Sequence, residues 1–245
     1  MIKRIAPEVE VIDITHGIPP QHVLQGALVL ANTLPYMPAG VHVAIVDPGV
    51  GGVRKPLALR GADERVFIGP DNGLLLVAAE RLGGIAEAVE IADEAYMLEP
   101  VSHTFHGRDI FSPAAAHVAS GVELAKLGPL LDPAGLQRLE VPEPSVGEAR
   151  IRATVLYVDR YGNVQLNLNA EHLARVGIGP GDRVEVEVGF ERYFAAAART
   201  FGEARTGDIV LYEDAYANIA LAINRGNAAQ MFSVRVGDEL RLSPA

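Results

Sequence analysis

The pattern of apolar and polar positions at the start of the chain predicts a helix end, a strand and a second helix. Residues 8–15 alternate and then run apolar like a strand, and the residues before them, from Met1, look like the end of a helix. Residues 22–34 place apolar side chains at helical spacing. That spacing stops at Pro35, which cannot continue a helix.

Two later segments share one design, a short apolar strand followed by a carboxylate and a turn. Residues 41–46 form the first strand and end at Asp47, and residues 66–69 end at Asp71 before a helix that starts at Leu74. Strands that alternate with helices predict an α/β domain with a Rossmann-like, mostly parallel sheet. Ligands of such sheets bind beyond the carboxyl ends of the strands, where both aspartates lie.

The character of the sequence changes at a stretch rich in proline and glutamate. We predict a linker at 141–150, between an N-terminal α/β domain at 1–140 and a smaller C-terminal domain at 151–245. The last domain consists of strand-like runs broken by Gly, Asp and Asn, with one short helix at 169–177. This pattern is typical of a mainly antiparallel barrel or sandwich. We find no internal repeat.

Composition and charge limit the classes of function. The 245 residues are 49% hydrophobic, which suits one large core or two modest ones. The formal charge of −10 offers no basic face for nucleic acid, so a small molecule is the expected partner. The sequence has no cysteine, no signal-like start and no run of about 18 apolar residues. We therefore expect a cytoplasmic protein without a membrane span.

Ionisable side chains gather in the segment VSHTFHGRDIF, just before an Ala-rich helix. His103, His106 and Asp109 are enough for part of a metal site, but nothing elsewhere supplies convincing further ligands. We therefore expect no metal. Arg108 and Asp109 are expected to form a structural pair at the entrance of the helix, for which Ser112 is the predicted N-cap.

Two turns allow both a structural and a functional interpretation. The turn DPGVGG does not fit the dinucleotide pattern G-x-G-x-x-G, because Arg54 occupies the last position. Asp47 either caps this turn or lies near a ligand that the glycines allow to approach closely. In DRYGN, Asp159 and Asn163 either hold a polar edge of a ligand or form an ordinary hairpin turn. A serine hydrolase is not expected, because no G-x-S-x-G elbow is present.

Taken in order, six motifs resemble those of the S-adenosyl-L-methionine hydroxide adenosyltransferases. They are DITHGIPPQ, VDPGVGGVR, GPDNGLL, TFHGRD, DRYGN and NRGNAA, and they run from about Arg4 to Leu242. The family is related to the fluorinases and chlorinases, which attack the same substrate carbon with a halide. The resemblance implies an N-terminal α/β domain, a C-terminal β-barrel and a homotrimer. It places each active site between the N-terminal domain of one subunit and the C-terminal domain of its neighbour.

The resemblance also assigns catalytic roles to particular residues. The catalytic Asp, Arg and His of the family fall on Asp47, Arg54 and His106. Fluorinases have tyrosines at the positions of Asp47 and His106, and a halide-holding serine at that of Gly107. This chain therefore resembles the branch that uses water.

Further positions are implied to bind the substrate. These are Gln21, Thr104, Phe105, Gly107, Asp159, Asn163, Phe201, Asn227 and Ala228. Gln21 stands where fluorinases have an aromatic residue beside the ribose. Family members begin with a strand and loop of the form T-D-F-G…D-x-Y-V, whose Asp binds the ribose diol, and the printed sequence starts after that segment.

The expected reaction is displacement at the ribose C5′ of S-adenosyl-L-methionine by water, which gives adenosine and methionine without a cofactor. One alternative is a halide-using adenosyltransferase, against which His106 and Gly107 argue. A second is an adenosyl-binding module without catalysis. A methyltransferase would need an acceptor site and a nucleotide-binding glycine pattern, and neither is found.

Overall fold

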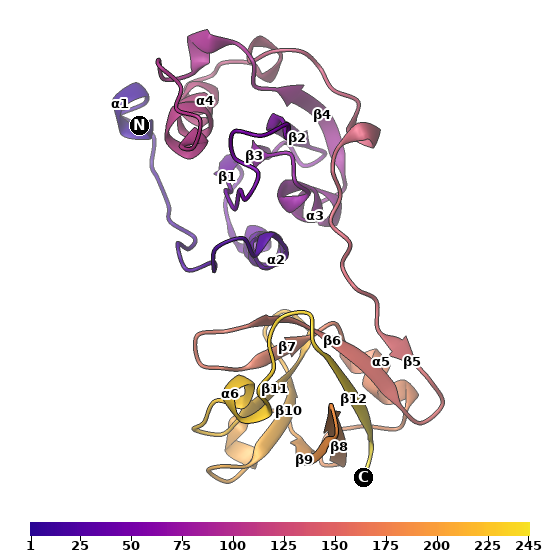
Figure 1. The fold of residues 1–245 in the computed structure, drawn as a ribbon. Coiled ribbons are helices and arrows are strands. Elements are labelled where there is room, and N and C mark those ends of the chain that lie inside the picture. The colour runs from indigo at the N-terminus through magenta and orange to yellow at the C-terminus, as the bar shows by residue number, and fades with distance from the viewer. The chain divides into compact units, whose positions relative to one another are not determined.

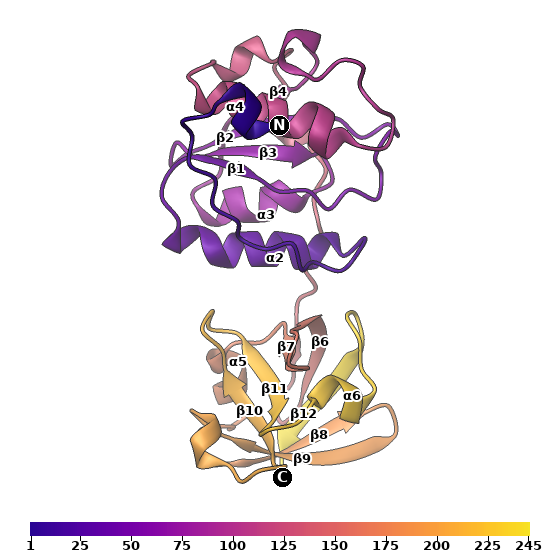
Figure 2. The ribbon, with the colours of Figure 1, turned by 90° about the vertical axis from the view of Figure 1, so that its left-hand side faces the viewer.

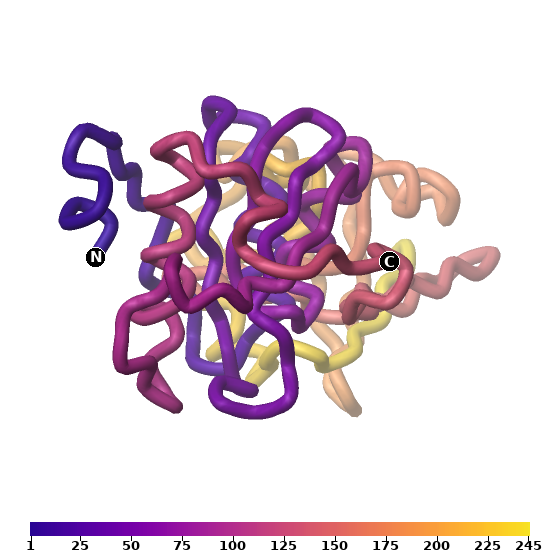
Figure 3. Tube along the Cα trace, turned by 90° about the horizontal axis from the view of Figure 1, so that it is seen from above, coloured from indigo at the N-terminus to yellow at the C-terminus, as the bar shows by residue number.

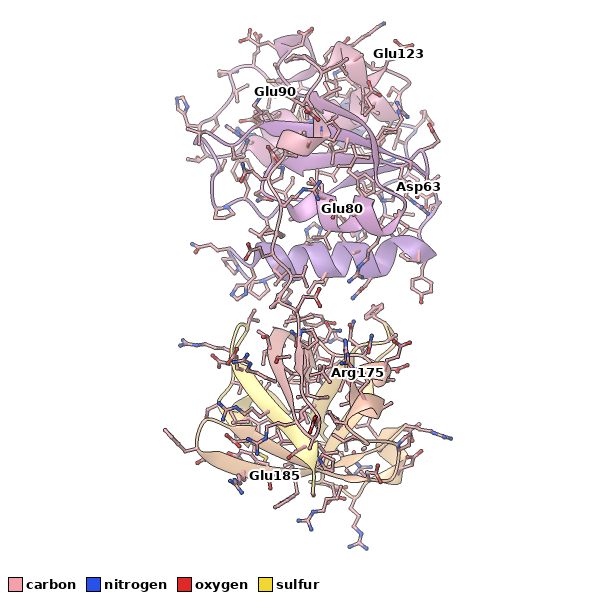
Figure 4. All side chains as sticks on the ribbon, turned by 90° about the vertical axis from the view of Figure 1, so that its right-hand side faces the viewer. Asp63, Glu80, Glu90, Glu123, Arg175 and Glu185 are labelled. Carbon is pink, nitrogen blue, oxygen red and sulfur yellow. The ribbon has the colours of Figure 1, made fainter.

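The computed structural model describes residues 1–245, which divide into two compact units, Met1–Glu140 and Val141–Ala245, called unit 1 and unit 2 below (Figure 1). None of the six charged residues labelled in Figure 4 is buried. No helix has both the length and the apolar character that crossing a bilayer requires.

Unit 1 is built around a four-stranded sheet. Its elements are α1 (Ile2–Ile5), α2 (Val23–Thr33), η1 (Leu34–Tyr36), β1 (Val41–Val43), β2 (Pro56–Gly61), β3 (Val66–Pro70), α3 (Leu74–Arg81), β4 (Ile85–Glu90), η2 (Glu94–Tyr96), η3 (Gly107–Phe111), α4 (Ser112–Ala119), η4 (Leu124–Lys126) and η5 (Pro133–Gly135). The predicted helices at 22–34 and from Leu74 are present as α2 and α3. As expected, α2 ends before Pro35.

The sheet is mixed, so the prediction of a Rossmann-like, mostly parallel sheet is wrong. The strand order is β1-β3-β2-β4; β1 pairs with β3 in parallel, whereas β2 pairs with β3 and β4 in antiparallel fashion. No strand was predicted at the position of β2. A turn in which the amide of Gly61 donates to the carbonyl of Arg65 joins β2 to β3, and a connection this short permits only antiparallel pairing.

Helices cover both faces of this sheet, with α2 and α3 on one side and α4 on the other (Figure 2). Successive strand residues serve opposite faces: Leu57 and Phe67 pack with the first pair of helices, and Ala58 and Ile68 pack with α4. The result is a helix–sheet–helix sandwich that fixes the loops at the carboxyl ends of β1 and β3.

Two local predictions for unit 1 are wrong. Residues 8–15 form no strand; they follow α1 and are mostly exposed, at the edge of the unit (Figure 3). An alternating pattern of apolar and polar residues favours a strand only where a neighbouring strand is available for pairing. Ser112 does not cap α4, because the π-helical turn η3 leads directly into that helix and Ser112 already has helical backbone angles.

Unit 2 is a closed barrel with short helices. Its elements are β5 (Ser145–Val146), β6 (Ile151–Val158), β7 (Val164–Leu166), α5 (Ala170–Arg175), β8 (Arg183–Val188), β9 (Glu191–Ala197), η6 (Phe201–Glu203), β10 (Ile209–Glu213), β11 (Ile219–Ile223), α6 (Ala228–Phe232) and β12 (Glu239–Pro244). Seven strands follow one another as β12-β8-β9-β10-β11-β7-β6, and pairing of β12 with β6 closes the ring. The predicted barrel is therefore confirmed.

The interior of the barrel is apolar, with fully buried residues such as Val164, Val186, Leu221 and Leu240. The segment 141–150, predicted as a linker, contains β5, which pairs with β6. Part of this segment is therefore paired with the sheet of unit 2.

Candidate active site

Arg54 joins Asp47 and His106 into one cluster in unit 1. Its Nε lies 3.0 Å from both carboxylate oxygens of Asp47, and its Nη2 lies 2.5 Å from Asp47 Oδ2. The same Nη2 lies 2.7 Å from Nδ1 of His106. The side chains of Arg54 and Asp47 are only 9% and 6% exposed, so their charges neutralise each other out of bulk water.

The glycine-rich turn after β1 positions this cluster. Asp47 and Arg54 stand at its two ends, and Gly51 has φ of 74°. A Cβ atom at Gly51 would overlap the carbonyl oxygen of His103. Only glycine therefore lets the turn pack against the segment that leads to His106.

The π-helical turn η3 holds the other side of the cluster. Asp109 is fully buried; its Oδ2 accepts a hydrogen bond from the amide of Ser102 at 2.9 Å, and its Oδ1 accepts one from Nε of Arg108 at 2.6 Å. The guanidinium of Arg108 lies 5.0 Å from the centre of the Phe105 ring. The expected Arg108–Asp109 pair is thus present, and it restrains the residues on both sides of His106.

The electrostatics favour a neutral imidazole at His106. Burial and, next, the Arg54 guanidinium lower the pKa of His106, while Asp47 and Asp109 oppose that shift. Arginine can only donate, so Nδ1 of His106 must accept, and the proton of the neutral ring is then on Nε2.

A cavity of about 490 Å³ opens beside this cluster. Its lining residues are Thr15, His16, Ile18, Pro19, Pro20, Gln21, Ile45, Val46, Asp47 and Pro48. Asp47 is the member of the cluster that lines it. Gln21, one of the positions predicted to bind the substrate, lies on the opposite loop with φ of 69°.

The other predicted substrate positions of unit 1 lie immediately before and after His106 in the chain. Phe105 is 58% exposed, Thr104 precedes it, and Gly107 begins η3. Asp71, the second aspartate at a strand end, does not join the cluster, because its Oδ1 accepts a hydrogen bond from the amide of Gln137. Burial raises the pKa of Asp71.

Unit 2 has a cavity of its own, of about 420 Å³. It is lined by Tyr157, Asp159, Asn163, Gln165, Arg199, Thr200, Phe201, Tyr212, Glu213, Asp214, Ala215, Tyr216 and Ala220. Three of the predicted positions, Asp159, Asn163 and Phe201, are therefore brought together here. Asn227 and Ala228 are not part of the lining: Asn227 caps α6, and Ala228 is fully buried.

The other residues of this lining, above all Gln165, Tyr212 and Asp214, were not predicted from the sequence. One signal was available. The pattern D-x-Y-x-N occurs at Asp159 and again at Asp214, so the chain contains a short internal repeat where none was predicted.

No three or more His, Cys, Asp or Glu side chains gather closely enough to hold a metal ion.

Comparison with known proteins places the chain in a family. Residues 1–128 match the SAM hydroxide adenosyltransferase N-terminal domain, and residues 153–241 match the C-terminal domain of the same family. The chain belongs to the SAM hydroxide adenosyltransferase family. It is 42% identical to the (R)-S-adenosyl-L-methionine hydrolase of Salinispora tropica, over 99% of this chain and 90% of that protein.

The likeness extends to solved structures and to the halide-using relatives. A crystal structure of an uncharacterised conserved protein from Thermotoga maritima shares 36% identity with a TM-score of 0.90, and the match covers 99% of this chain and 92% of that one. The fluorinase of Actinopolyspora mzabensis is more distant, at 26% identity over 99% of this chain and 90% of that enzyme. This chain is thus more similar to the hydrolase than to the fluorinase.

Proposed function

We propose that this protein hydrolyses S-adenosyl-L-methionine to adenosine and L-methionine, by in-line attack of water on C5′ of the ribose. The hydrolase relative supports the proposal. The observation that carries it is the contact of Arg54 with both Asp47 and His106, because it fixes a carboxylate and an imidazole beside a cavity.

The nucleophile is the difficult part of this reaction. The sulfonium leaves as a neutral thioether, so its departure needs no general acid. Water, with a pKa of about 15.7, is a weak nucleophile while neutral. General-base assistance is worth about 10²- to 10⁴-fold, and in-line positioning in a restricted site adds an effective molarity of about 10⁵ M or more.

The tautomer of His106 suggests how the proton moves. With Nδ1 accepting from Arg54, the Nε2–H group is a donor, and it holds the oxygen of the attacking water. Asp47 has the acceptor lone pairs and lines the cavity, so it takes the proton as the C5′–O bond forms and the C5′–S bond breaks. Arg54 orients this carboxylate through charge-assisted hydrogen bonds.

The assignment of substrate-binding residues remains part of the proposal. We place Gln21, Thr104, Phe105 and Gly107 of unit 1, and Asp159, Asn163, Phe201, Asn227 and Ala228 of unit 2, in contact with the substrate. The two cavity linings support four of these, Gln21 in unit 1 and Asp159, Asn163 and Phe201 in unit 2.

Other expectations are proposals as well. The chain acts without a cofactor, works in the cytoplasm and assembles as a homotrimer. Residues 1–140 and 151–245 form its two domains, with 141–150 between them.

Product analysis tests the function. The purified protein is incubated with S-adenosyl-L-methionine in ¹⁸O-water that contains chloride, and the nucleosides are identified by liquid chromatography and mass spectrometry. Adenosine with ¹⁸O at C5′ is the expected product. 5′-Chloroadenosine would assign the halide reaction instead, and tight binding without product would indicate a binding module.

A further inference from the structure

The guanidinium of Arg54 has a further contact besides those with Asp47 and His106. Its central carbon lies over the ring of Phe111, 5.3 Å from the ring centre. At this distance a cation is attracted to the face of an aromatic ring. Asp47 and His106 contact nitrogen atoms of the same guanidinium. Arg54 is thus held by two polar partners and one aromatic ring.

Phe111 is anchored in the core of unit 1. It is fully buried between the sheet and α4, in a cluster that includes Ala58 of β2 and Ile68 of β3 (Figure 2). A ring packed in this way has little freedom to move, because protein interiors are as dense as organic crystals. An arginine side chain, in contrast, has many rotamers to lose. The contact therefore joins the long side chain of Arg54 to a rigid part of the fold.

A π-helical turn brings Phe111 and His106 to the same guanidinium. His106 precedes η3 and Phe111 ends it, and the amide of Ser112 donates to the carbonyl of Gly107, five residues back. In an α-helix, residues five apart lie about 140° apart around the axis, because 3.6 residues make one turn. In a π-helix the hydrogen bonds join residues five apart, so such residues lie on one face. The wider turn thus lets both side chains reach Arg54.

The backbone confines the other end of the Arg54 side chain. A Cβ atom at Gly49 would lie only 3.3 Å from Cγ of Arg54, so the glycine-rich turn packs tightly on the first part of this side chain. Phe111 contacts its far end. Held at both ends, Nη2 lies between Oδ2 of Asp47 and Nδ1 of His106, without the freedom of an exposed arginine.

We propose that Phe111 is a positioning residue for the hydrolysis, because its ring fixes the guanidinium of Arg54. Through this guanidinium it sets the relative placement of the Asp47 carboxylate and the His106 imidazole. The inference rests on the proposed function, in which these two groups hold the same water. Phe111 is fully buried, so it acts on the step at C5′ only through the alignment of the cluster.

Two variants of Phe111 and one matched control test this role. Phe111→Leu and Phe111→Met keep a buried apolar side chain but remove the ring. Phe67→Leu is the control, because Phe67 is also fully buried in unit 1 but belongs to the core on the other face of the sheet. The three variants should lose comparable stability in thermal unfolding, since each gives up a buried ring.

Steady-state kinetics with S-adenosyl-L-methionine give the first measurement. Both Phe111 variants should lower kcat about 10- to 100-fold and leave KM within about twofold of wild type, because a displacement of about 1 Å in a catalytic group costs this much in rate. Phe67→Leu should retain the wild-type kcat. An unchanged kcat in the Phe111 variants, a loss through KM alone, or an equal loss in the control would overturn the inference.

The titration of His106 gives a second measurement, which needs no turnover. Burial, then Arg54 and, least, His103 lower the pKa of His106, whereas Asp47 and Asp109 raise it. A guanidinium released from the ring moves away from the imidazole and no longer neutralises the Asp47 carboxylate. Both changes favour the protonated imidazole, so the pKa of His106 should rise.

NMR spectroscopy follows this titration, with the His106 signal assigned by its absence from His106→Gln. The pKa should rise in both Phe111 variants and keep its wild-type value in Phe67→Leu. An unchanged pKa in the Phe111 variants would overturn the inference even if kcat falls. If the pKa rises as expected but the wild-type protein converts no S-adenosyl-L-methionine, the proposed hydrolysis is wrong, whereas the role of Phe111 in holding the cluster is supported.

Discussion

Replacing Asp47 by Asn tests the assignment of the proton acceptor most directly. The change keeps the size of the side chain and one carbonyl oxygen that Arg54 can still contact. It removes the negative charge and most of the basicity, so an attacking water could no longer pass its proton to this group. Hydrolysis would then depend on positioning alone.

The two expected magnitudes differ enough to be told apart. Loss of general-base assistance lowers the rate by about 10²- to 10⁴-fold, which equals about 2.7–5.5 kcal/mol in the barrier. In the fold, Asp47→Asn weakens a nearly buried ion pair whose side chains are 6% and 9% exposed. A lost hydrogen bond to a charged group costs about 1.5–3 kcal/mol, against about 5–15 kcal/mol for the stability of a domain. The variant should therefore fold and bind but turn over slowly.

The assay combines three measurements on the same preparation. Adenosine formation gives kcat, calorimetry gives substrate affinity, and thermal unfolding reports the fold. Asp63→Asn is the matched control, because Asp63 also pairs with an arginine of unit 1, Arg65, and lies outside the cluster. Its kcat should equal that of wild type.

A second change checks that the cluster acts as a unit. In the double variant Asp47→Asn with Arg54→Gln, the loss of rate should be much smaller than the product of the two single losses. Retention of more than about a tenth of wild-type kcat by a folded Asp47→Asn protein would refute the role of this carboxylate.

Three further predictions follow from individual residues. Burial and the adjacent guanidinium lower the pKa of His106 from 6.5. In a pH profile, kcat should therefore be constant near neutral pH and fall in acid as the ring gains a proton. A midpoint of that fall above pH 6.5 would contradict this. Gly162→Ala should lower the free energy of unfolding by about 1–2 kcal/mol or more, because Gly162 has φ of 82° and a Cβ would overlap Asn227. Ala217→Gly, at the matching position of the turn 214–218, should not destabilise the protein. Equal changes in stability of the two variants, measured by calorimetry, would refute the reasoning. Burial raises the pKa of Asp71, so the stability that its protonated carboxyl contributes is complete below pH 3.8 and is lost as pH rises. Asp71→Asn should therefore raise Tm at pH 7 and leave it unchanged near pH 3. A rise in Tm that persists in acid would be inconsistent with this cause.

The elements predicted best from sequence were those with a long period and a clear stop. Helix α2 spans three turns and ends before Pro35, and β3 leads through a turn into α3. Strand β2 was missed because a short apolar run between turns has too little periodicity to distinguish it. The segment 8–15 was predicted as a strand from alternation, but a strand also needs a partner edge, which a local pattern does not specify.

The candidate site divides in the same way. Asp47, Arg54 and His106 could be singled out by motif, yet only the fold shows that one nitrogen of Arg54 contacts both of the others. Gln165 and Asp214 are 49 residues apart on different hairpins, and their contact depends on the pairing of β7 with β11. Such contacts between distant segments are decided by strand order, which the sequence pattern left open.

The closure of the barrel by β12 and β6 also has a consequence for biosynthesis. β6 is the first long strand of unit 2 and β12 the last, so the ring cannot close until residues 239–244 have left the ribosome. Until then, one side of β6 presents unpaired amides and carbonyls beside its apolar face, the kind of edge that joins strands of other chains. Nascent chains that pause before β12 should therefore be the species most in need of a chaperone.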